Sequence, residues 1–200
     1  MAAHSAASGA AELDALQSVS GWRAHSREHL LRYRLAVVAT NAVEAVRHVG
    51  GLVCDRTMAG WEVTVLLADA TDVRALRILG ATVLDLERSL ASPVHDTWPH
   101  AVAVDPRMFV ADARVRRGVL ECLDHELIEV ALWGEELPRE LDNRLGTVQH
   151  RLSGAARAFK GAALTAAGAP DAETGGAEVF RCGELLLTGM WGGSDLVAAG

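Results

Sequence analysis

The residues that could carry chemistry come directly after the predicted strands. The first apolar run, residues 35–39, leads into the turn TNAVEA, in which Asn41 and Glu44 are the groups able to hold a ligand. An amide and a carboxylate offer only oxygen, which suits a hard cation such as Mg²⁺, Ca²⁺ or Mn²⁺. His48 follows Glu44 by four residues, and on a helix this spacing favours a solvent-facing salt bridge over a metal pair.

Other polar groups stand near the ends of the remaining predicted strands. They could rebuild a site, but each is typical of a helix cap or a loop; they are Asp69, Asp72, Asp85, His100 and Asp105. The basic residues Arg114, Arg116 and Arg117 fall in a predicted helix, where such a group usually forms a solvated face.

Strands alternating with helices must position these groups. Apolar and β-branched runs predict strands at residues 35–39, 62–68, 81–86, 100–104, 129–133 and 147–152. Helical spacing predicts helices at residues 43–60, 72–79, 112–127 and 154–167. This order predicts an α/β class: a three-layer, Rossmann-like fold with a mostly parallel central sheet and ligands at the carboxyl ends of the strands. We expect one domain at residues 21–190, a flexible tail at residues 1–20 and a loose tail at residues 191–200.

The usual α/β ligand motifs are missing from the first turn. A dinucleotide site needs G-x-G-x-x-G after the first strand, and a P-loop needs G-x-x-x-x-G-K-[ST]; the sequence ATNAVEA supplies neither. The chain also lacks the G-x-S-x-G elbow of α/β-hydrolases. Gly50 and Gly51 stand inside the first long helix, where each costs roughly 1 kcal/mol relative to Ala, so we expect a close approach of another backbone or of a bound ligand, with tight helix packing favoured over the ligand.

The amino-acid composition argues against several classes of binding partner and site. The net charge of -7 argues against broad nucleic-acid binding, and no apolar segment is long enough to span a membrane. The 3 cysteines show no C-x-x-C spacing, which argues against a zinc-thiolate site. Without a recognisable secretory signal, the expected location is the cytoplasm.

Several segments, in collinear order from residue 35 to residue 180, resemble the PIG-L/LmbE-type N-deacetylases. They are GGLVCDRTMAGWEVTVLLAD, VRRGVLECL, LIEVALWGEELP, LSGAARAFKGAAL (with Lys160) and GAEVF. The resemblance implies the fold of a zinc hydrolase, an enzyme that removes acetyl groups from N-acetylglucosamine-type sugars. It also implies two metal motifs, His-Pro-Asp-Asp-Glu after the first strand and His-Pro-Asp-His before VRRGVLECL.

The sequence departs from both motifs. Counting back from Gly50-Gly51, the first motif falls on residues 41–45, which places Asn41 at a zinc ligand, Val43 at the base and Glu44 at the second ligand. The second motif falls on residues 109–112, which places Phe109 at the charge-stabilising His and Asp112 at the ligand. Zinc favours imidazole and thiolate, and Val cannot accept a proton. We therefore expect the zinc of the family to be lost, with no other cofactor.

Three hypotheses follow. The leading one is a non-catalytic PIG-L/LmbE-like protein, a pseudo-N-deacetylase acting in binding of a sugar-like ligand or in association with a protein or a second copy of itself. The alternative is a metal-dependent N-deacetylase on an amino-sugar-like substrate, with a rebuilt site of Asn41, Glu44 and Asp112 around a harder cation. A Rossmann-like nucleotide-binding protein is third. The leading hypothesis allows a sugar-sized cleft at the carboxyl ends of the strands. The sequence leaves open whether this cleft is open or is filled by side chains such as Met108 and Phe109.

Overall fold

A computed structural model describes residues 33–91, 99–134, 137–183 and 196–198 of the chain. The chain divides into residues 1–32 and a unit that begins at Tyr33, and only the second unit contains described residues. The flexible tail predicted at residues 1–20 therefore lies outside the described residues. The described part is an α/β fold built on an eight-stranded sheet of order β3-β2-β1-β4-β5-β7-β6-β8. The predicted fold class is confirmed.

Five parallel strands form one side of this sheet. They are β1 (Arg34–Asn41), β2 (Glu62–Asp69), β3 (Thr82–Asp85), β4 (Ala101–Val104) and β5 (Glu129–Trp133). The chain runs outward from β1 through β2 to β3, then returns to place β4 on the other side of β1. Strand order thus reverses between β1 and β4, which is where α/β sheets usually bind ligands.

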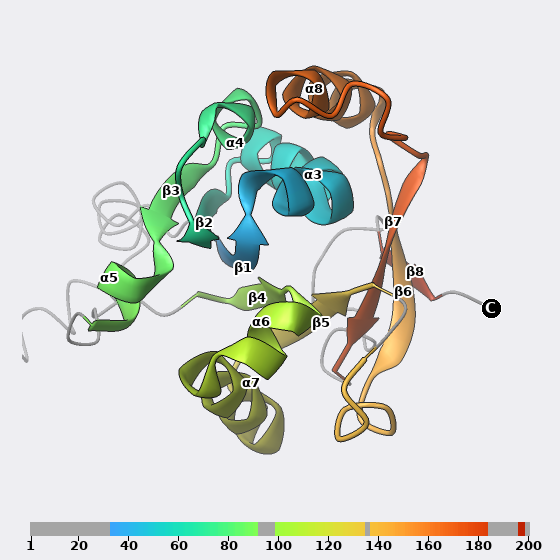
Figure 1. The fold of residues 1–200 in the computed structure, drawn as a ribbon. Helices are drawn as coiled ribbons and strands as arrows, with labels where there is room; N and C mark the ends of the chain where they lie inside the picture. The colour runs from blue at the N-terminus through green and yellow to red at the C-terminus, as the bar shows by residue number, and fades with distance from the viewer. Residues whose placement is uncertain (1–32, 92–98, 135–136, 184–195, 199–200) are drawn as a thin grey trace, which may run out of the picture. The chain divides into compact units, whose positions relative to one another are not determined.

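Helices cover both faces of the parallel strands (Figure 1). One face carries α3 (Ala42–Met58), α4 (Arg74–Ile78) and α8 (Gly154–Ala166). The opposite face carries α6 (Pro106–Ala111) and α7 (Ala113–His125), and α5 (Leu86–Ala91) lies at the end of the sheet beside β3. Each face has its own apolar core, one built around Val37, Val46 and Leu164 and the other around Val104, Phe109 and Leu132. Sheet and helices make the three predicted layers.

Three antiparallel strands complete the sheet. They are β6 (Gly146–Arg151), β7 (Ala177–Cys182) and β8 (Leu196–Ala198), and β7 pairs with both β5 and β6. Within the tail predicted at residues 191–200, Leu196–Ala198 pair with β6. Three residues are too short for a pattern of alternation to show in the sequence. Within the described residues, no helix is long and apolar enough to cross a membrane.

The paired glycines of α3 are explained by close packing. A Cβ on Gly51 would stand 2.4 Å from Cγ of Leu152, the residue that follows β6. On the same helix the N–H groups of Gly51 and Leu52 donate to the carboxylate of Glu178 on β7. The expected close approach is therefore made by the protein's own side chains.

Candidate functional site

The turn from β1 to α3 uses its polar groups to start the helix. Asn41 has extended backbone angles, φ -154° and ψ 174°, and its Oδ1 accepts a hydrogen bond of 3.0 Å from the backbone N–H of Glu44. This is the ordinary geometry of an N-cap, for which Asn is among the preferred residues. The amide oxygen predicted as a metal donor is thus engaged by the helix itself.

A second helix starts beside it, at the end of β4. Asp105 caps α6, and its Oδ1 accepts from the backbone N–H of Arg107 at 2.9 Å, with Pro106 at the first helical position. Its other oxygen, Oδ2, accepts from the hydroxyl of Thr40 at 2.8 Å. Asp105 is buried. Because it follows β4 and bonds to Thr40 on β1, its carboxylate joins the ends of these two strands at the point where strand order reverses.

A guanidinium bridges the two helix starts. Nη2 of Arg107 lies 2.9 Å from Oδ2 of Asp105 and 2.5 Å from Oε2 of Glu44. Nε of Arg107 also donates to Oδ1 of Asp105, at 3.1 Å. Glu44 receives a second contact, from Nη1 of Arg47 at 3.0 Å. We call Glu44, Asp105 and Arg107 the bridged cluster; sequence reasoning named both carboxylates but missed the arginine.

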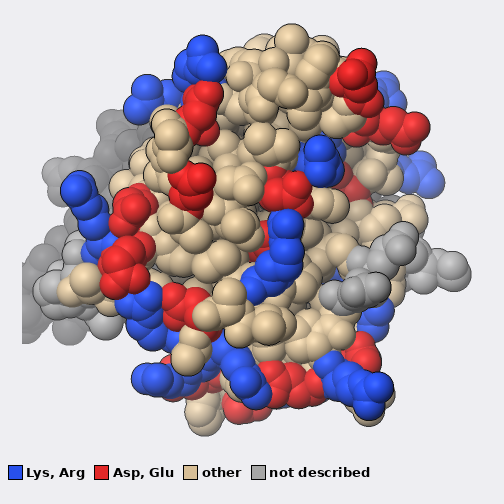
Figure 2. Space-filling model, in the orientation of Figure 1, with Lys and Arg blue, Asp and Glu red and all other residues tan. Residues whose placement is uncertain are grey.

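Burial and charge act in opposite directions on the bridged cluster. Burial favours a raised pKa for Asp105, but hydrogen bonds from Arg107 and Thr40 outweigh it and hold the pKa of that carboxyl below its ordinary value. The hydrogen bond to Asp105 raises the pKa of Arg107 in turn. The side chain of Asp105 is 2% exposed and that of Arg107 is 56% exposed, so a buried anion is balanced by a cation that reaches solvent. Figure 2 shows basic and acidic side chains close together on this face, between α3 and α6.

His48 lies one turn along α3 from Glu44. Its ring stacks on Trp133, the last residue of β5, with centroids 6.4 Å apart and planes 11° from parallel. Nε2 of His48 is 3.6 Å from Oε2 of Glu44. Burial lowers the pKa of His48 and Glu44 only partly opposes this, so the imidazole is mainly neutral near pH 7. The predicted pairing of the two side chains is present, though with a largely uncharged ring.

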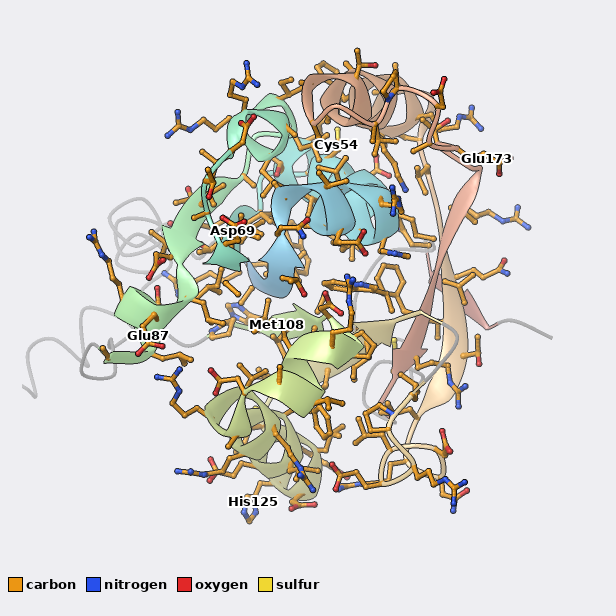
Figure 3. All side chains as sticks on the ribbon, in the orientation of Figure 1. Cys54, Asp69, Glu87, Met108, His125 and Glu173 are labelled. Atoms are coloured by element: carbon orange, nitrogen blue, oxygen red, sulfur yellow. The ribbon has the colours of Figure 1, made fainter. Side chains whose placement is uncertain are left out.

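The second predicted motif lies on α6 and at the start of α7. Met108 and Phe109 are buried in the core on this side of the sheet, and Figure 3 shows Met108 on α6 beneath β1. Both side chains therefore belong to the apolar core on this side of the sheet. Asp112 caps α7 by accepting from the backbone N–H of Arg114 and of Val115, and Nη2 of Arg114 lies 2.7 Å from its Oδ2. The hydrogen bond from Arg114 lowers the pKa of Asp112 to about 2.

Asp112 therefore pairs away from the bridged cluster. Arg114 also reaches Oε2 of Glu87 on α5, at 2.7 Å, so this arginine holds Asp112 and Glu87 together. Arg107 instead holds Glu44 and Asp105. The structure thus distributes Glu44 and Asp112 between two separate ion-pair networks.

The remaining sequence candidates serve local structure. Asp69 accepts from Thr71, Asp72 pairs with Arg74, and Asp85 accepts from the backbone N–H of Arg88. His100 lies at the opposite end of the sheet, where its Nδ1 accepts from the backbone N–H at the start of β1. The prediction that these residues are caps and loop groups fits the contacts of all four; the fifth, Asp105, is the exception because it also joins the bridged cluster.

The described residues do not fit the metal that the resemblance implies. Among them, no group of three or more His, Cys, Asp or Glu side chains is placed to hold a metal ion. Each donor of the predicted set has a protein partner: Asn41 caps α3, Glu44 binds two arginines and Asp112 caps α7. Val43 stands at the position of the base and carries no group that could accept a proton.

Three of the segments that carry the family resemblance meet at a second cluster, inside the molecule. Nζ of Lys160 on α8 donates to Oε1 of Glu178 at 2.6 Å, and both side chains are 2% exposed. The same carboxylate accepts from the backbone N–H of Gly51 at 2.7 Å and of Leu52 at 2.8 Å. We call Gly51, Leu52, Lys160 and Glu178 the buried cluster. The sequence showed each segment separately but not their contact.

Comparisons with known proteins extend the likeness at the level of the fold. No protein-family model matches the sequence, and no curated protein matches it. Among solved structures, the chain is similar to the A40926 pseudoaglycone deacetylase Dbv21, with 16% identity, a TM-score of 0.54 and coverage of 75% of this chain and 96% of that one. A triple mutant of the teicoplanin-pathway deacetylase Orf2 gives 14% identity and a TM-score of 0.53 over 83% of this chain and 98% of that one. A deacetylase in complex with teicoplanin gives 14% identity and a TM-score of 0.51, with coverage of 74% of this chain and 97% of that one. The chain therefore shares the fold of these antibiotic-pathway deacetylases.

Proposed function

We propose that this chain is a non-catalytic protein with a deacetylase fold, related in design to the PIG-L/LmbE enzymes, that acts by binding a sugar-like ligand or by associating with a partner. The observation that carries the proposal is the state of Glu44. It is the one carboxylate left at the first metal motif, and its oxygens contact Arg47 and Arg107. A carboxylate neutralised by two guanidinium groups is a poor ligand for a metal.

The base position supports the same conclusion. Hydrolysis of an amide needs a group that takes a proton from the attacking water, and such help is worth roughly 10²–10⁴-fold in rate. Val43 occupies that position, and Phe109 occupies the position at which the family places a charge-stabilising His. Both replacements remove a group that would act on the reacting atoms.

The alternative is a metal-dependent N-deacetylase with a rebuilt site. The similarity to deacetylase structures favours it, because those proteins carry out this reaction on the same fold. It requires Asn41, Glu44 and Asp112 to leave their present partners and to gather around one hard cation. Two ion-pair networks would have to open for this to happen.

Turnover separates the two proposals. The full chain, supplied in separate samples with Zn²⁺, Mn²⁺ and Mg²⁺, would be incubated with N-acetylglucosamine and N,N′-diacetylchitobiose, and released amine measured by a fluorogenic amine reagent. We expect no amine above the summed signals of two controls, protein without sugar and sugar without protein. Release that disappears in Glu44→Ala would overturn the non-catalytic proposal and establish the alternative.

Binding is tested on the same protein. Thermal shift against the same sugars measures ligand binding, and light scattering after gel filtration measures self-association. Stabilisation by a sugar supports the ligand role, and a concentration-dependent dimer supports association. If neither appears, binding of these sugars and self-association are both contradicted.

A further inference from the structure

One nitrogen of Arg107 lies between two carboxylates that come from different parts of the chain. Nη2 is 2.5 Å from Oε2 of Glu44 at the start of α3 and 2.9 Å from Oδ2 of Asp105 at the end of β4. The three residues thus form a small cation site whose occupant is covalently part of the protein.

The oxygens of this site are held in place independently of the guanidinium. Asp105 accepts from the hydroxyl of Thr40 and from the backbone N–H of Arg107, a contact that needs no arginine side chain. Glu44 is fixed on the first turn of α3 by the Asn41 cap and receives Nη1 of Arg47. Removal of the Arg107 side chain would therefore leave two oriented carboxylates around the vacated position.

The negative charge of the two carboxylates would attract a cation to the vacated position. With Arg107 in place, the side chain of Asp105 is 2% exposed and that of Glu44 is 17% exposed, so removal of the guanidinium would leave two anions facing each other without a cation between them. A buried charge that has lost its partner is strongly unfavourable, and carboxylate oxygens prefer hard divalent cations. The guanidinium now supplies the positive charge that such an ion would bring.

We propose that Glu44 and Asp105 form a cation site occupied by Arg107, and that this side chain keeps a divalent cation out. The inference rests on the proposed function, because it explains how the fold keeps its charge balance without a metal. It concerns a pair of carboxylates that includes Asp105, which lies outside both metal motifs of the resemblance.

A second arginine in the same protein provides a matched control. Arg114 also contacts two carboxylates, Asp112 and Glu87, at 2.7 Å each. Here Glu87 is 71% exposed, and Asp112 already accepts from the N–H groups at the start of α7. Removal of Arg114 leaves the carboxylate of Glu87 in water, so it creates no position between two largely buried carboxylates.

The experiment measures Mn²⁺ binding by electron paramagnetic resonance, which counts free Mn²⁺, together with thermal stability by circular dichroism. We expect Arg107→Ala and the longer Arg107→Gln to bind about one Mn²⁺ per chain, as two carboxylates and water can hold it. Both should be stabilised by Mn²⁺, whereas the wild type, Arg107→Lys and Arg114→Ala should show neither effect. The double variant Glu44→Ala/Arg107→Ala should lose the site.

The proposal is overturned if a folded Arg107→Ala or Arg107→Gln protein binds Mn²⁺ no better than the wild type. It is also overturned if Arg114→Ala gains the same ion, since the effect would then follow from net charge alone. Deacetylase turnover by the wild-type chain would instead contradict the proposed function and leave this binding result to stand or fall separately.

Discussion

In both the buried cluster and the bridged cluster, basic side chains neutralise a carboxylate that lies on α3 or contacts it. The two clusters differ in burial and in the groups that donate to the carboxylate. Glu178 is enclosed, and its oxygens receive Lys160 and two backbone N–H groups from the middle of α3. Glu44 lies at the start of the same helix and receives guanidinium groups that reach solvent. The residues of the buried cluster fall in segments that resemble the deacetylases, whereas Glu44 of the bridged cluster lies at a position where the resemblance implies a metal ligand. The framework of this fold is thus maintained by contacts separate from those that would perform chemistry.

The largest expected effect comes from breaking the buried cluster. Glu178→Ala leaves the Lys160 ammonium enclosed without its partner and removes the acceptor of two N–H groups in α3. Because a buried charge without a partner is costly, we expect a loss of about 3–5 kcal/mol in the free energy of unfolding, measured by urea denaturation.

The double variant Lys160→Met/Glu178→Gln sharpens the test. It removes both charges and keeps one acceptor oxygen, enough for one of the two N–H groups, those of Gly51 and Leu52, that now bond to separate oxygens of Glu178. Recovery of much of the lost stability would show that the unpaired ammonium, and not the loss of shape, accounts for the effect. Equal stability of Glu178→Ala and the wild type would contradict the importance given to this cluster.

A smaller effect is expected from Gly51→Ala. The added methyl would stand 2.4 Å from Cγ of Leu152, so α3 or the segment after β6 must shift. Overpacking of this kind costs about 1–3 kcal/mol, readable from the same denaturation curves.

Gly118 in α7 is the matched control, because a Cβ there meets nothing within 4 Å. Gly118→Ala should stabilise the chain by up to about 1 kcal/mol through helix propensity alone. If both substitutions stabilise, close packing does not explain the paired glycines.

The bridged cluster should contribute less and should depend on pH. The pKa of Asp105 is lowered in the folded state, so its charge stabilises the fold above the ordinary range of Asp and the contribution disappears as pH falls through the lowered value. Asp105→Asn should therefore cost about 1 kcal/mol at pH 7, less than the roughly 1.5–3 kcal/mol of a charged hydrogen bond, because Arg107 is half exposed and screened. Unfolding measured from pH 7 down to pH 3 should show the two proteins converging, and a constant difference would contradict this.

Sequence patterns predicted the framework of the fold better than the candidate site. The strand at Glu129–Trp133 and the helix after Ser153 were predicted nearly to the residue, because apolar runs and a capping Ser are local signals. The six-residue helix α6 was missed since it spans fewer than two turns. The place of β7 between β5 and β6 depends on pairing between distant segments, which the spacing of residues along the chain does not encode.

The site shows the same limit more clearly. Asn41, Glu44 and Asp105 were all identified as polar groups near strand ends, but Arg107, the shared partner of Glu44 and Asp105, was not. Arg107 is 63 residues from Glu44 in the chain, so the contact that neutralises that carboxylate left no local signal. A cap two residues before an arginine, as in Asp105-Pro106-Arg107, is the only hint the sequence offers.

The most direct measurement of the central claim is the metal content of the protein. The chain would be purified without chelator, dialysed against zinc, manganese and magnesium in turn, and analysed by inductively coupled plasma mass spectrometry beside Glu44→Ala. The account predicts no ion retained near one per chain, since Arg107 already supplies the positive charge between Glu44 and Asp105. One tightly held ion per chain, lost in Glu44→Ala, would contradict the account and restore the metal-dependent hydrolase.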